Sequence, residues 1–243
     1  MATKTAIILG VGPHEGLGAA LAKQAGRQGL HVFVGGRTLA KVTSVADAIV
    51  AAGGKATPVQ CDATDEADII RLFVDAEAVG PVDLAIYNAG NNMPGGVEGM
   101  EAAYFEKCWR ICTFGAFLFA REAAKVMAPR EAGTLLFTGA SSSMRGRAGF
   151  AAFSSAKGAL RNLAQSAAKE LGPKGIHVGH VVIDGGIEGE KLKTMVPDYA
   201  KARAAEGRLI DIAGIADIYF MLYGQKRAAQ SFEVDVRTHN EPW

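Results

Sequence analysis

The sequence predicts an α/β protein with a doubly wound parallel sheet of about seven strands and helices on both faces. Short apolar runs alternate along the chain with longer runs that have helical spacing. A glycine-rich turn follows the first short run, as in sheets that bind a ligand at the carboxyl ends of their strands. A length of 243 residues with 49% hydrophobic content suits one α/β domain with a full core, so residues 1–243 are assigned to a single domain.

The individual elements follow from the length and the flanks of each apolar run. Buried strands are expected at residues 5–9, 31–35, 56–60, 82–87, 134–138 and 176–183, and an alternating edge strand at 231–237. A first helix is expected to end near residue 27, and others to occupy residues 39–52, 66–79, 102–127, 150–171 and 211–223. The polar segment 184–210 is predicted to cover the substrate as a lid, mostly helical.

Charge balance and cysteine content favour a small-molecule partner. Lys and Arg total 26 against 25 acidic residues and no run of like charge stands out, which argues against nucleic-acid and membrane surfaces. The three cysteines lack metal-ligand spacing with histidine, so no metal site is expected. We expect these cysteines to be reduced thiols in a cytoplasmic protein. Neither a secretory leader nor an apolar run of membrane-spanning length is evident.

The turn after the first strand has the composition of an anion site. Gly12, Gly16 and Gly18 stand four and two residues apart. Without Cβ atoms the backbone can lie against a ligand, and free amides at the start of the following helix face an anion, most economically a pyrophosphate. The alternative is a turn that only packs a helix closely against a strand.

Two further motifs, in the same order and at matching distances, give this chain a resemblance to the short-chain dehydrogenase/reductase family. The glycine spacing resembles that family's GxxxGxG, Asn88-Ala89-Gly90 resembles its NAG signature, and Asp62 matches the acidic residue that contacts adenine. The resemblance extends to about Ile187 and implies a Rossmann-type fold, a nicotinamide cofactor and oxidoreductase activity. By this resemblance the cofactor-binding residues are Gly12, Gly16, Leu17, Gly18, Asp62, Ala63, Asn88, Ala89, Gly90, Lys157 and Ile187.

The end of the second strand favours NADP over NAD. An NAD site usually places a carboxylate there for the ribose diol. This chain has Gly35-Gly36-Arg37-Thr38, and the planar fork of Arg37 can pair with a 2′-phosphate, with His14 as a second donor. Arg37 as a solvated surface residue is the alternative.

The chain differs from the family at the position of the residue that acts as general acid. In the family a Ser binds the carbonyl, a Tyr exchanges the proton, and a Lys four residues later lowers the pKa of the phenol and holds the nicotinamide ribose. Lys157 and Ser141 match two of these positions, with Ser142 as the fallback for the serine. Phe153 occupies the Tyr position, and a phenyl ring cannot donate a proton.

Three accounts of this departure stay open. A reductase could take its proton from water or from a relocated group, for which Cys112 at the family's Asn position, Glu188 and Tyr199 are candidates. Alternatively, the hydride step could need no protein acid, as in reduction of an activated double bond or an imine. The third account is a catalytically silent NADP(H) sensor or scaffold.

Three smaller expectations complete the sequence reading. Ile187 can offer its backbone to the nicotinamide carboxamide, although the family's threonine is missing there. His177 and His180, among valines, are expected to be hydrogen-bonded core residues. In the family the two long helices, residues 102–127 and 150–171, pair between subunits, so the resemblance implies a homodimer or homotetramer.

Overall fold

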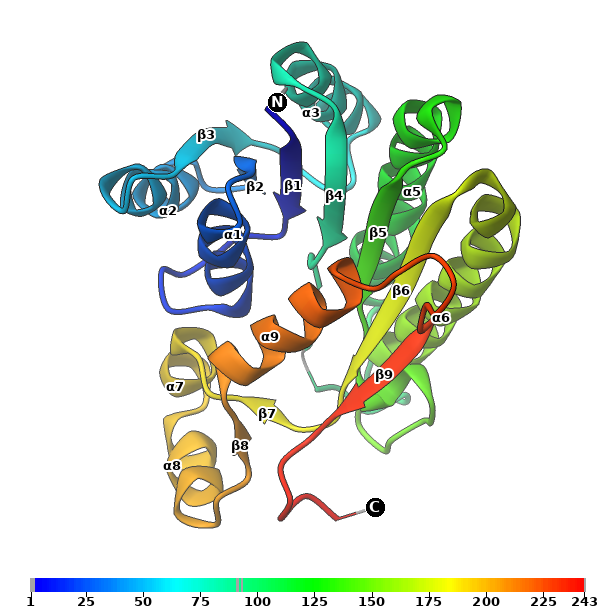
Figure 1. Cartoon of the computed structure of the whole chain (residues 1–243). Helices are drawn as coiled ribbons and strands as arrows, with labels where there is room; N and C mark the ends of the chain where they lie inside the picture. Colours follow the sequence, from blue (N-terminus) through cyan, green and yellow to red (C-terminus); the bar gives the residue numbers. More distant parts are fainter. Residues whose placement is uncertain (1–2, 91, 93, 243) are drawn as a thin grey trace.

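A seven-stranded sheet, parallel at every pairing, forms the centre of the molecule. The structure is a computed structural model that describes residues 3–90, 92 and 94–242. The strand order is β3-β2-β1-β4-β5-β6-β9, so the chain winds outward from β1 in one direction and from β4 in the other (Figure 1). The strands are β1 (Thr5–Leu9), β2 (His31–Gly36), β3 (Lys55–Gln60), β4 (Val82–Tyr87), β5 (Gly133–Thr138), β6 (Ile176–Ile183) and β9 (Glu233–Val236). The predicted doubly wound sheet is confirmed.

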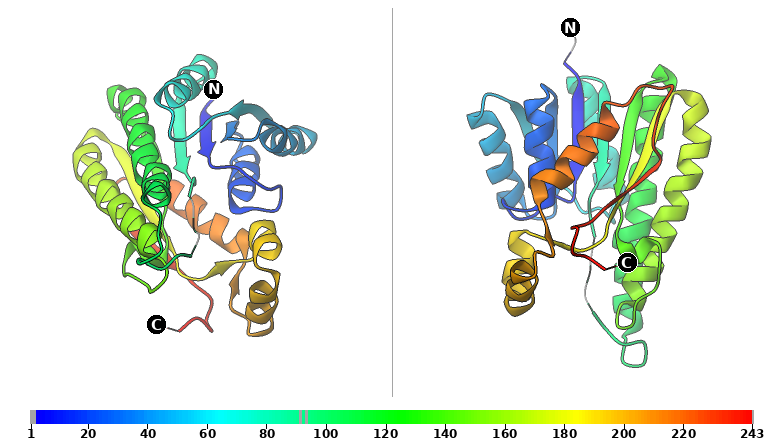
Figure 2. Two further views of the ribbon diagram at one scale, coloured as in Figure 1. Left: turned by 180° about the vertical axis from the view of Figure 1, so that it is seen from behind. Right: turned by 60° about the horizontal axis from the view of Figure 1, so that its bottom comes forward.

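Helices cover both faces of this sheet (Figure 2). One face carries α1 (Leu17–Arg27), α2 (Leu39–Ala51) and α9 (Ile212–Tyr223), and the other carries α3 (Glu66–Val79), α4 (Ala102–Trp109), α5 (Gly115–Met127) and α6 (Ala151–Leu171). The inner strands of the sheet therefore have almost no solvated face, which explains why their sequences are mostly apolar runs, whereas the edge strands β3 and β9 are partly exposed.

β1 shows how one strand supplies both cores. All five of its residues are buried. Ala6 and Ile8 belong to the cluster beneath α1, α2 and α9, whereas Ile7 and Leu9 belong to the cluster on the opposite face. This alternation is the period of two that a strand imposes on its side chains. β1 thus anchors the glycine turn, which begins at its carboxyl end, between two packed layers.

The expected helix over residues 102–127 is interrupted. A π-helical turn, η1 (Arg110–Phe114), separates α4 from α5. The turn changes the backbone register, and its Ile111 carbonyl accepts a hydrogen bond of 2.5 Å from the buried Tyr87 hydroxyl. Thr113 in the same turn donates to the Ala156 carbonyl of α6 over 2.8 Å. Such turns often mark functional positions in helices.

The lid segment is more varied than an all-helical lid. It contains α7 (Glu190–Met195) and α8 (Pro197–Ala205), as expected, but a two-stranded parallel ribbon of β7 (Gly186–Ile187) and β8 (Leu209–Ile210) joins its two ends. Both strands have only two residues, too few for a periodic pattern to identify them in the sequence.

Candidate active site

The glycine turn leaves open space beside its backbone at one position and packs closely at another. A Cβ on Gly12 would meet no atom within 4 Å, whereas one on Gly18 would lie 2.8 Å from the Gly10 carbonyl oxygen. Gly18 is therefore required for close packing of α1 on β1, and Gly12 borders open space. α1 begins after Gly16, with no side-chain cap and no acidic residue in its first turn, and Leu17 is buried as its first residue. The free helix start suits an anion.

Asn88 ties together the ends of three strands beside this turn. Its side-chain amide donates to the Gly10 carbonyl over 3.1 Å, and its Oδ1 accepts from the Thr138 hydroxyl over 3.0 Å. The buried Tyr219 hydroxyl in turn donates to Thr138 Oγ1 over 2.7 Å. Ala89 and Gly90 follow at the same edge, so the structure brings the NAG motif and the glycine turn together.

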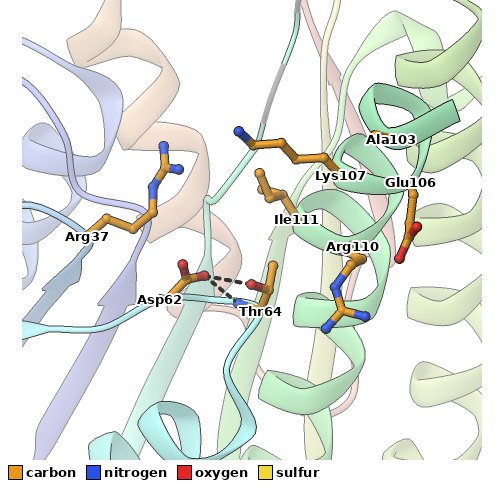
Figure 3. Close-up of a pocket in the computed structure, with 8 residues that line it drawn as sticks. All are labelled: Arg37, Asp62, Thr64, Ala103, Glu106, Lys107, Arg110 and Ile111. Carbon is orange, nitrogen blue, oxygen red and sulfur yellow. Dashed lines mark hydrogen bonds between the residues drawn. The ribbon is translucent and has the colours of Figure 1, made fainter. Parts of the chain in front are cut away.

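A pocket of about 260 Å³ opens beyond the ends of β2 and β3. Arg37 and Asp62 line one side and Lys107 and Arg110 of the α4–η1 region line the other. In Figure 3, Arg37 and Lys107 extend toward the opening from opposite sides. Asp62 accepts hydrogen bonds of 2.8 Å from the backbone and hydroxyl of Thr64, which fixes its carboxylate at the pocket wall. Three cationic side chains, the fixed carboxylate of Asp62 and a second carboxylate, Glu106, line the pocket, and such a set suits a phosphorylated ribose and an amino-bearing base.

His14 and Ala63 occupy the borders of this region. The exposed His14 faces α1, where its Nε2 accepts from the Lys23 ammonium over 2.9 Å, and it lines a second cavity of about 450 Å³ between α1 and α9 with Lys23. Its side chain is thus not among those lining the Arg37 pocket. Ala63 is buried, and its carbonyl lies so close to Gly115 that a Cβ there would be 2.3 Å away.

Lys157 is buried on α6 and reaches the carboxyl ends of the central strands. Its ammonium donates to the Thr138 carbonyl over 2.7 Å and lies 5.7 Å from the centre of the Phe153 ring. A Cβ on Gly90 would be 3.7 Å from Nζ, so Lys157 is next to the NAG motif. Burial lowers the pKa of Lys157, and in the described part of the chain no carboxylate lies within ion-pair distance of it.

Phe153 fills its position as an apolar residue. It is 7% exposed and packs with Ala152, Ala156, Cys108 and Cys112. Because Phe153 and Lys157 are four residues apart on α6, they lie on the same side of the helix. The ring therefore occupies the place where a phenol would stand beside the ammonium.

The serines after β5 form a short 3₁₀ turn, η3 (Ser141–Ser143). Ser141 and Ser142 are half-buried, while Ser143 is buried and its Oγ accepts the Ala140 amide over 3.1 Å. The loop that follows is attached to β6, because Arg145 donates two hydrogen bonds of 3.2 and 2.9 Å to the buried carboxylate of Asp184. The three sequence-predicted residues Ser141, Phe153 and Lys157 thus lie on η3 and α6, two elements that are packed together.

The three candidate replacement acids lie in different surroundings. Cys112 is fully buried in η1, where it hydrogen-bonds Cys108, and that bond and burial raise the pKa of Cys108. Glu188 is exposed and pairs with Lys193 at 3.3 Å. Tyr199 is exposed on α8 and accepts a hydrogen bond of 3.0 Å from Arg203. Of the three, Cys112 is the one that interacts electrostatically with Lys157.

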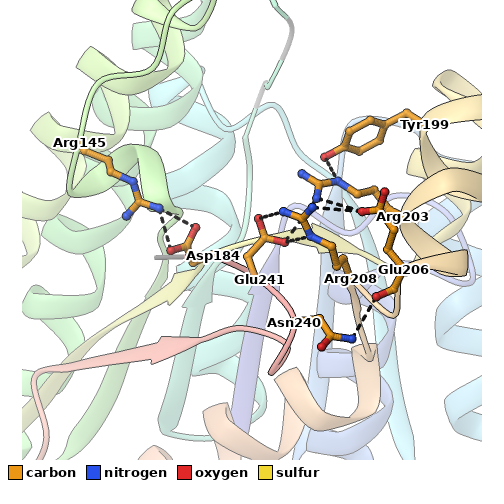
Figure 4. Close-up of polar contacts among 8 residues, drawn as sticks. All are labelled: Arg145, Asp184, Tyr199, Arg203, Glu206, Arg208, Asn240 and Glu241. Carbon is orange, nitrogen blue, oxygen red and sulfur yellow. Dashed lines mark hydrogen bonds and ion pairs between the residues drawn. The ribbon is translucent and has the colours of Figure 1, made fainter.

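The lid is tied to the C-terminal segment by polar contacts (Figure 4). Glu241 accepts from Arg208 over 3.3 Å and lies 3.8 Å from Arg203, and Asn240 donates to the Glu206 carbonyl over 3.0 Å. Ile187 lies in β7, near the start of the lid, and its carbonyl accepts a hydrogen bond of 2.8 Å from the Gly189 amide.

Sequence reasoning gave no role to Lys107, Thr138 or Asp184. Thr138 and Asp184 end or follow a buried strand, and that placement is a usable signal, because parallel strands direct their carboxyl ends to the ligand side. Lys107 lies on an amphipathic helix whose exposed face carries several charges, so nothing local distinguishes it. The expected core role of His177 and His180 agrees with their burial and hydrogen bonds.

No helix of the described residues has the length and apolar character to cross a bilayer. No group of three or more His, Cys, Asp or Glu side chains in those residues is placed to hold a metal ion.

Known proteins agree with this geometry. The sequence profile described as short chain dehydrogenase matches residues 4–199. Elsinochrome reductase 1 of Elsinoe fawcettii is 31% identical over 199 residues, which make up 81% of this chain and 73% of that protein.

Two solved structures resemble the whole fold and carry nicotinamide cofactors. A metagenomic short-chain oxidoreductase in complex with NADP has a TM-score of 0.81 at 25% identity, covering 98% of both chains. A 7α-hydroxysteroid dehydrogenase complexed with NADH and 7-oxo glycochenodeoxycholic acid has a TM-score of 0.88 at 25% identity, covering 98% of this chain and 94% of that one. With the profile match over most of its length, this chain belongs to the short-chain dehydrogenase family of oxidoreductases.

Proposed function

We propose that this protein is an NADP(H)-dependent reductase of small carbonyl or unsaturated compounds, with a site that lacks the family's phenolic acid. The observation that carries the proposal is the position of Lys157, a buried ammonium beside both the NAG motif and the end of β5. A buried cation that no carboxylate of the described residues pairs with is suited to stabilise negative charge on a reacting oxygen.

The residues at the strand ends fit a dinucleotide. Gly12 borders open space and the start of α1 is uncapped, which suits a pyrophosphate. Arg37 and Lys107 supply two cations to the pocket beyond β2, which favours a 2′-phosphate and hence NADP over NAD. When bound, the nicotinamide would supply or accept the hydride.

The chain's own residues would bind and orient the substrate. Ser141 would donate a hydrogen bond to the substrate carbonyl, and Lys157 would hold the ribose and offset the charge that develops on oxygen. Phe153 excludes water from the side of the ammonium and donates no proton. The proton would then come from solvent, or the substrate would be one whose reduced anion is stable without immediate protonation.

A silent NADP(H) sensor is the second candidate, and Phe153 is the observation that favours it. Loss of a positioned general acid typically costs about 10²- to 10⁴-fold in rate, which slows hydride transfer without abolishing it.

NADPH absorbance, followed with a panel of aldehydes, ketones, quinones, enones and imines, tests the two functions. The reductase predicts turnover by the native chain that Lys157→Ala removes. An inert native chain that nevertheless binds NADPH would identify the sensor. Failure to bind either cofactor would contradict both.

A further inference from the structure

A chain of polar side chains, buried at Ser143 and His180 and partly buried at Arg161 and Glu233, runs beneath the serine turn and is not used in the proposed chemistry. Arg161 of α6 donates two hydrogen bonds of 2.6 and 2.9 Å to Glu233 of β9. Glu233 Oε2 lies 2.9 Å from His180 Nδ1 of β6, and His180 Nε2 lies 3.4 Å from Ser143 Oγ of η3. Ser143 Oγ then accepts the Ala140 amide. Four elements that are distant in sequence are thus connected at one end of the site.

The chemistry of these groups fixes the direction of every hydrogen bond. A carboxylate only accepts, so His180 must donate from Nδ1 to Glu233. A neutral imidazole with its proton on Nδ1 has an acceptor at Nε2, and the Ser143 hydroxyl therefore donates to it. The Ser143 oxygen remains free to accept the Ala140 amide. The chain is fully consistent in this one arrangement, with a neutral His180.

The surroundings of His180 hold it in that state. The residue is fully buried, and a Cβ on Gly139 would lie 2.3 Å from its Nε2, so the glycine before the serine turn is what lets the ring approach. Burial lowers the pKa of His180 to about 4, although the hydrogen bond that His180 donates to Glu233 acts to raise it. The other charged groups acting on the ring are Lys157 and Arg161 of α6, and both also lower its pKa.

Ser143, His180 and Glu233 resemble a nucleophilic triad in composition but not in placement. Ser143 is 7% exposed, and its hydroxyl points to the buried ring. Ser141, two residues earlier in the same turn, is half-buried and is the serine to which the proposed function assigns the substrate carbonyl. A turn fixed at Ser143 therefore fixes Ser141 as well.

We infer that His180 is a positioning residue: it sets the orientation of η3, and through it the Ser141 hydroxyl, relative to Lys157. Arg161 lies four residues after Lys157, one helical turn further along α6, so the same helix supplies the ammonium and anchors the far end of the chain. The inference rests on the proposed reductase function of Ser141 and Lys157.

Variants of the full-length chain separate this role from general packing. His180→Asn keeps a donor for Glu233 and removes the acceptor for Ser143, and Ser143→Ala removes the opposite partner of the same bond. His177→Asn is the matched control, because His177 is also buried on β6 but bonds the Ser231 carbonyl at 2.9 Å. We expect both perturbing variants to lower kcat by about 10- to 100-fold on the best substrate of the panel. KM and the Kd for NADPH are expected to stay unchanged. Because the two substitutions break one bond, the double variant should be no slower than the single ones.

Nuclear magnetic resonance of the ¹⁵N-histidine-labelled protein gives a readout that does not need turnover. His180 should carry its proton on Nδ1, with an unprotonated Nε2, from pH 8 down to pH 5. Amide exchange at Ala140 should accelerate in His180→Asn and not in His177→Asn. If the native chain reduces nothing in the panel, the proposed function fails while these two readouts still decide the connection between His180 and η3. A proton on Nε2 at pH 7, an unchanged kcat in folded His180→Asn, or labelling of Ser143 by a fluorophosphonate would overturn the inference.

Discussion

At the scale of single residues, we expect Phe153 to have the largest effect on the proposed chemistry. Its ring lies on the Lys157 side of α6, with the ammonium 5.7 Å from the ring centre, so a hydroxyl added to the ring would stand in an environment that stabilises a phenolate. The ring packs in a small cluster with Cys108, Cys112 and alanines, against which Met100 and Tyr104 also pack.

We expect Phe153→Tyr to raise the rate of carbonyl reduction by about 10²- to 10⁴-fold, because it restores a positioned general acid. The rate of NADPH oxidation on the substrate panel measures the gain. Phe153→Leu, which keeps an apolar side chain, is the control and should show no gain. A tyrosine variant no faster than the native chain would mean that the hydride step does not depend on an acid at this position.

We expect Arg37 and Lys107, which line the pocket beyond β2, to favour NADPH over NADH. Replacing either by Ala removes one charged partner of a 2′-phosphate, and we expect the Kd for NADPH to rise about tenfold while the Kd for NADH changes little. Titration of cofactor fluorescence measures both constants. Arg110→Ala is the matched control, since Arg110 lines the same pocket but stacks on Phe114 at 4.9 Å. Equal binding of NADH and NADPH by the native chain would remove the argument.

Individual site residues differed in how well the sequence predicted them. The roles proposed for Gly18 and Asn88 could be foreseen, because both follow buried strands and serve local backbone geometry, and the contacts described above fit those roles. The Asp184 contact with Arg145 could not, because it joins residues 39 positions apart through a loop whose path no local pattern determines.

Among the elements, β9 supports the site from outside. It pairs with β6 in register from His180↔Glu233 to Ile183↔Val236. Two side-chain contacts reinforce that pairing, His180 with Glu233 at 2.9 Å and Asp184 with Arg237 at 3.0 Å. The strand was predicted from its alternating sequence, but its support of η3 and of the following loop was not, since alternation reports burial and not hydrogen-bond partners.

Acid should destabilise this strand pair before the carboxylates titrate. The unfolded His180 binds a proton near pH 6.5, whereas burial holds its folded pKa at about 4, so the unfolded state binds more protons between these values. The free energy of unfolding should therefore fall by about 3 kcal/mol as the pH drops from 6.5 to 4. Urea titrations at several pH values measure the slope.

His180→Asn provides the control for this pH dependence. The pKa of Glu233 is lowered, first by its hydrogen bonds from Arg161, so stability that depends on Glu233 is lost only at still lower pH. The variant should consequently lose the slope between pH 6.5 and 4 and keep the fall below it. An unchanged slope in the variant would assign the effect to another group.

The helix over 102–127 shows the limit of prediction at this scale. Its apolar period continues through residues 110–114, so nothing in the pattern signals the π-helical turn. The turn exists because tertiary partners, the Tyr87 hydroxyl and the Ala156 carbonyl, hydrogen-bond to it from neighbouring elements. The periodicity of one segment cannot predict which residues of neighbouring elements will hydrogen-bond to it.

For the molecule as a whole, the lid and the C-terminal segment form one unit. The Glu241 carboxylate, 13% exposed, lies between Arg203 of α8 and Arg208, and in this way the last described residues hold the lid from its far side. The topology of the whole molecule could be predicted from the order of strands and helices. The contact of Glu241 with Arg203 and Arg208 could not, because neither segment has a periodic pattern that would predict it.

We expect Glu241→Ala to accelerate amide exchange across residues 190–210 by roughly tenfold, because removing one partner of a partly buried charged pair costs about 1 to 3 kcal/mol. Exchange in β1 and β4 should stay unchanged. Glu206→Ala is the control, because the Glu206 side chain is 52% exposed and its loss should have a smaller effect. Equal acceleration in both variants would show that the lid is not held by Glu241 in particular.

The dependence of η3 on β9 also has a consequence for how the protein is made. His180 and its partner Glu233 are 53 residues apart, and Glu233 is translated after every other residue of the polar chain. A nascent polypeptide that has released β1 to β6 from the ribosome can assemble most of the sheet and its glycine turn, yet the ring beneath the serines then has no carboxylate to fix its tautomer. Cofactor affinity should accordingly mature earlier during synthesis than turnover does.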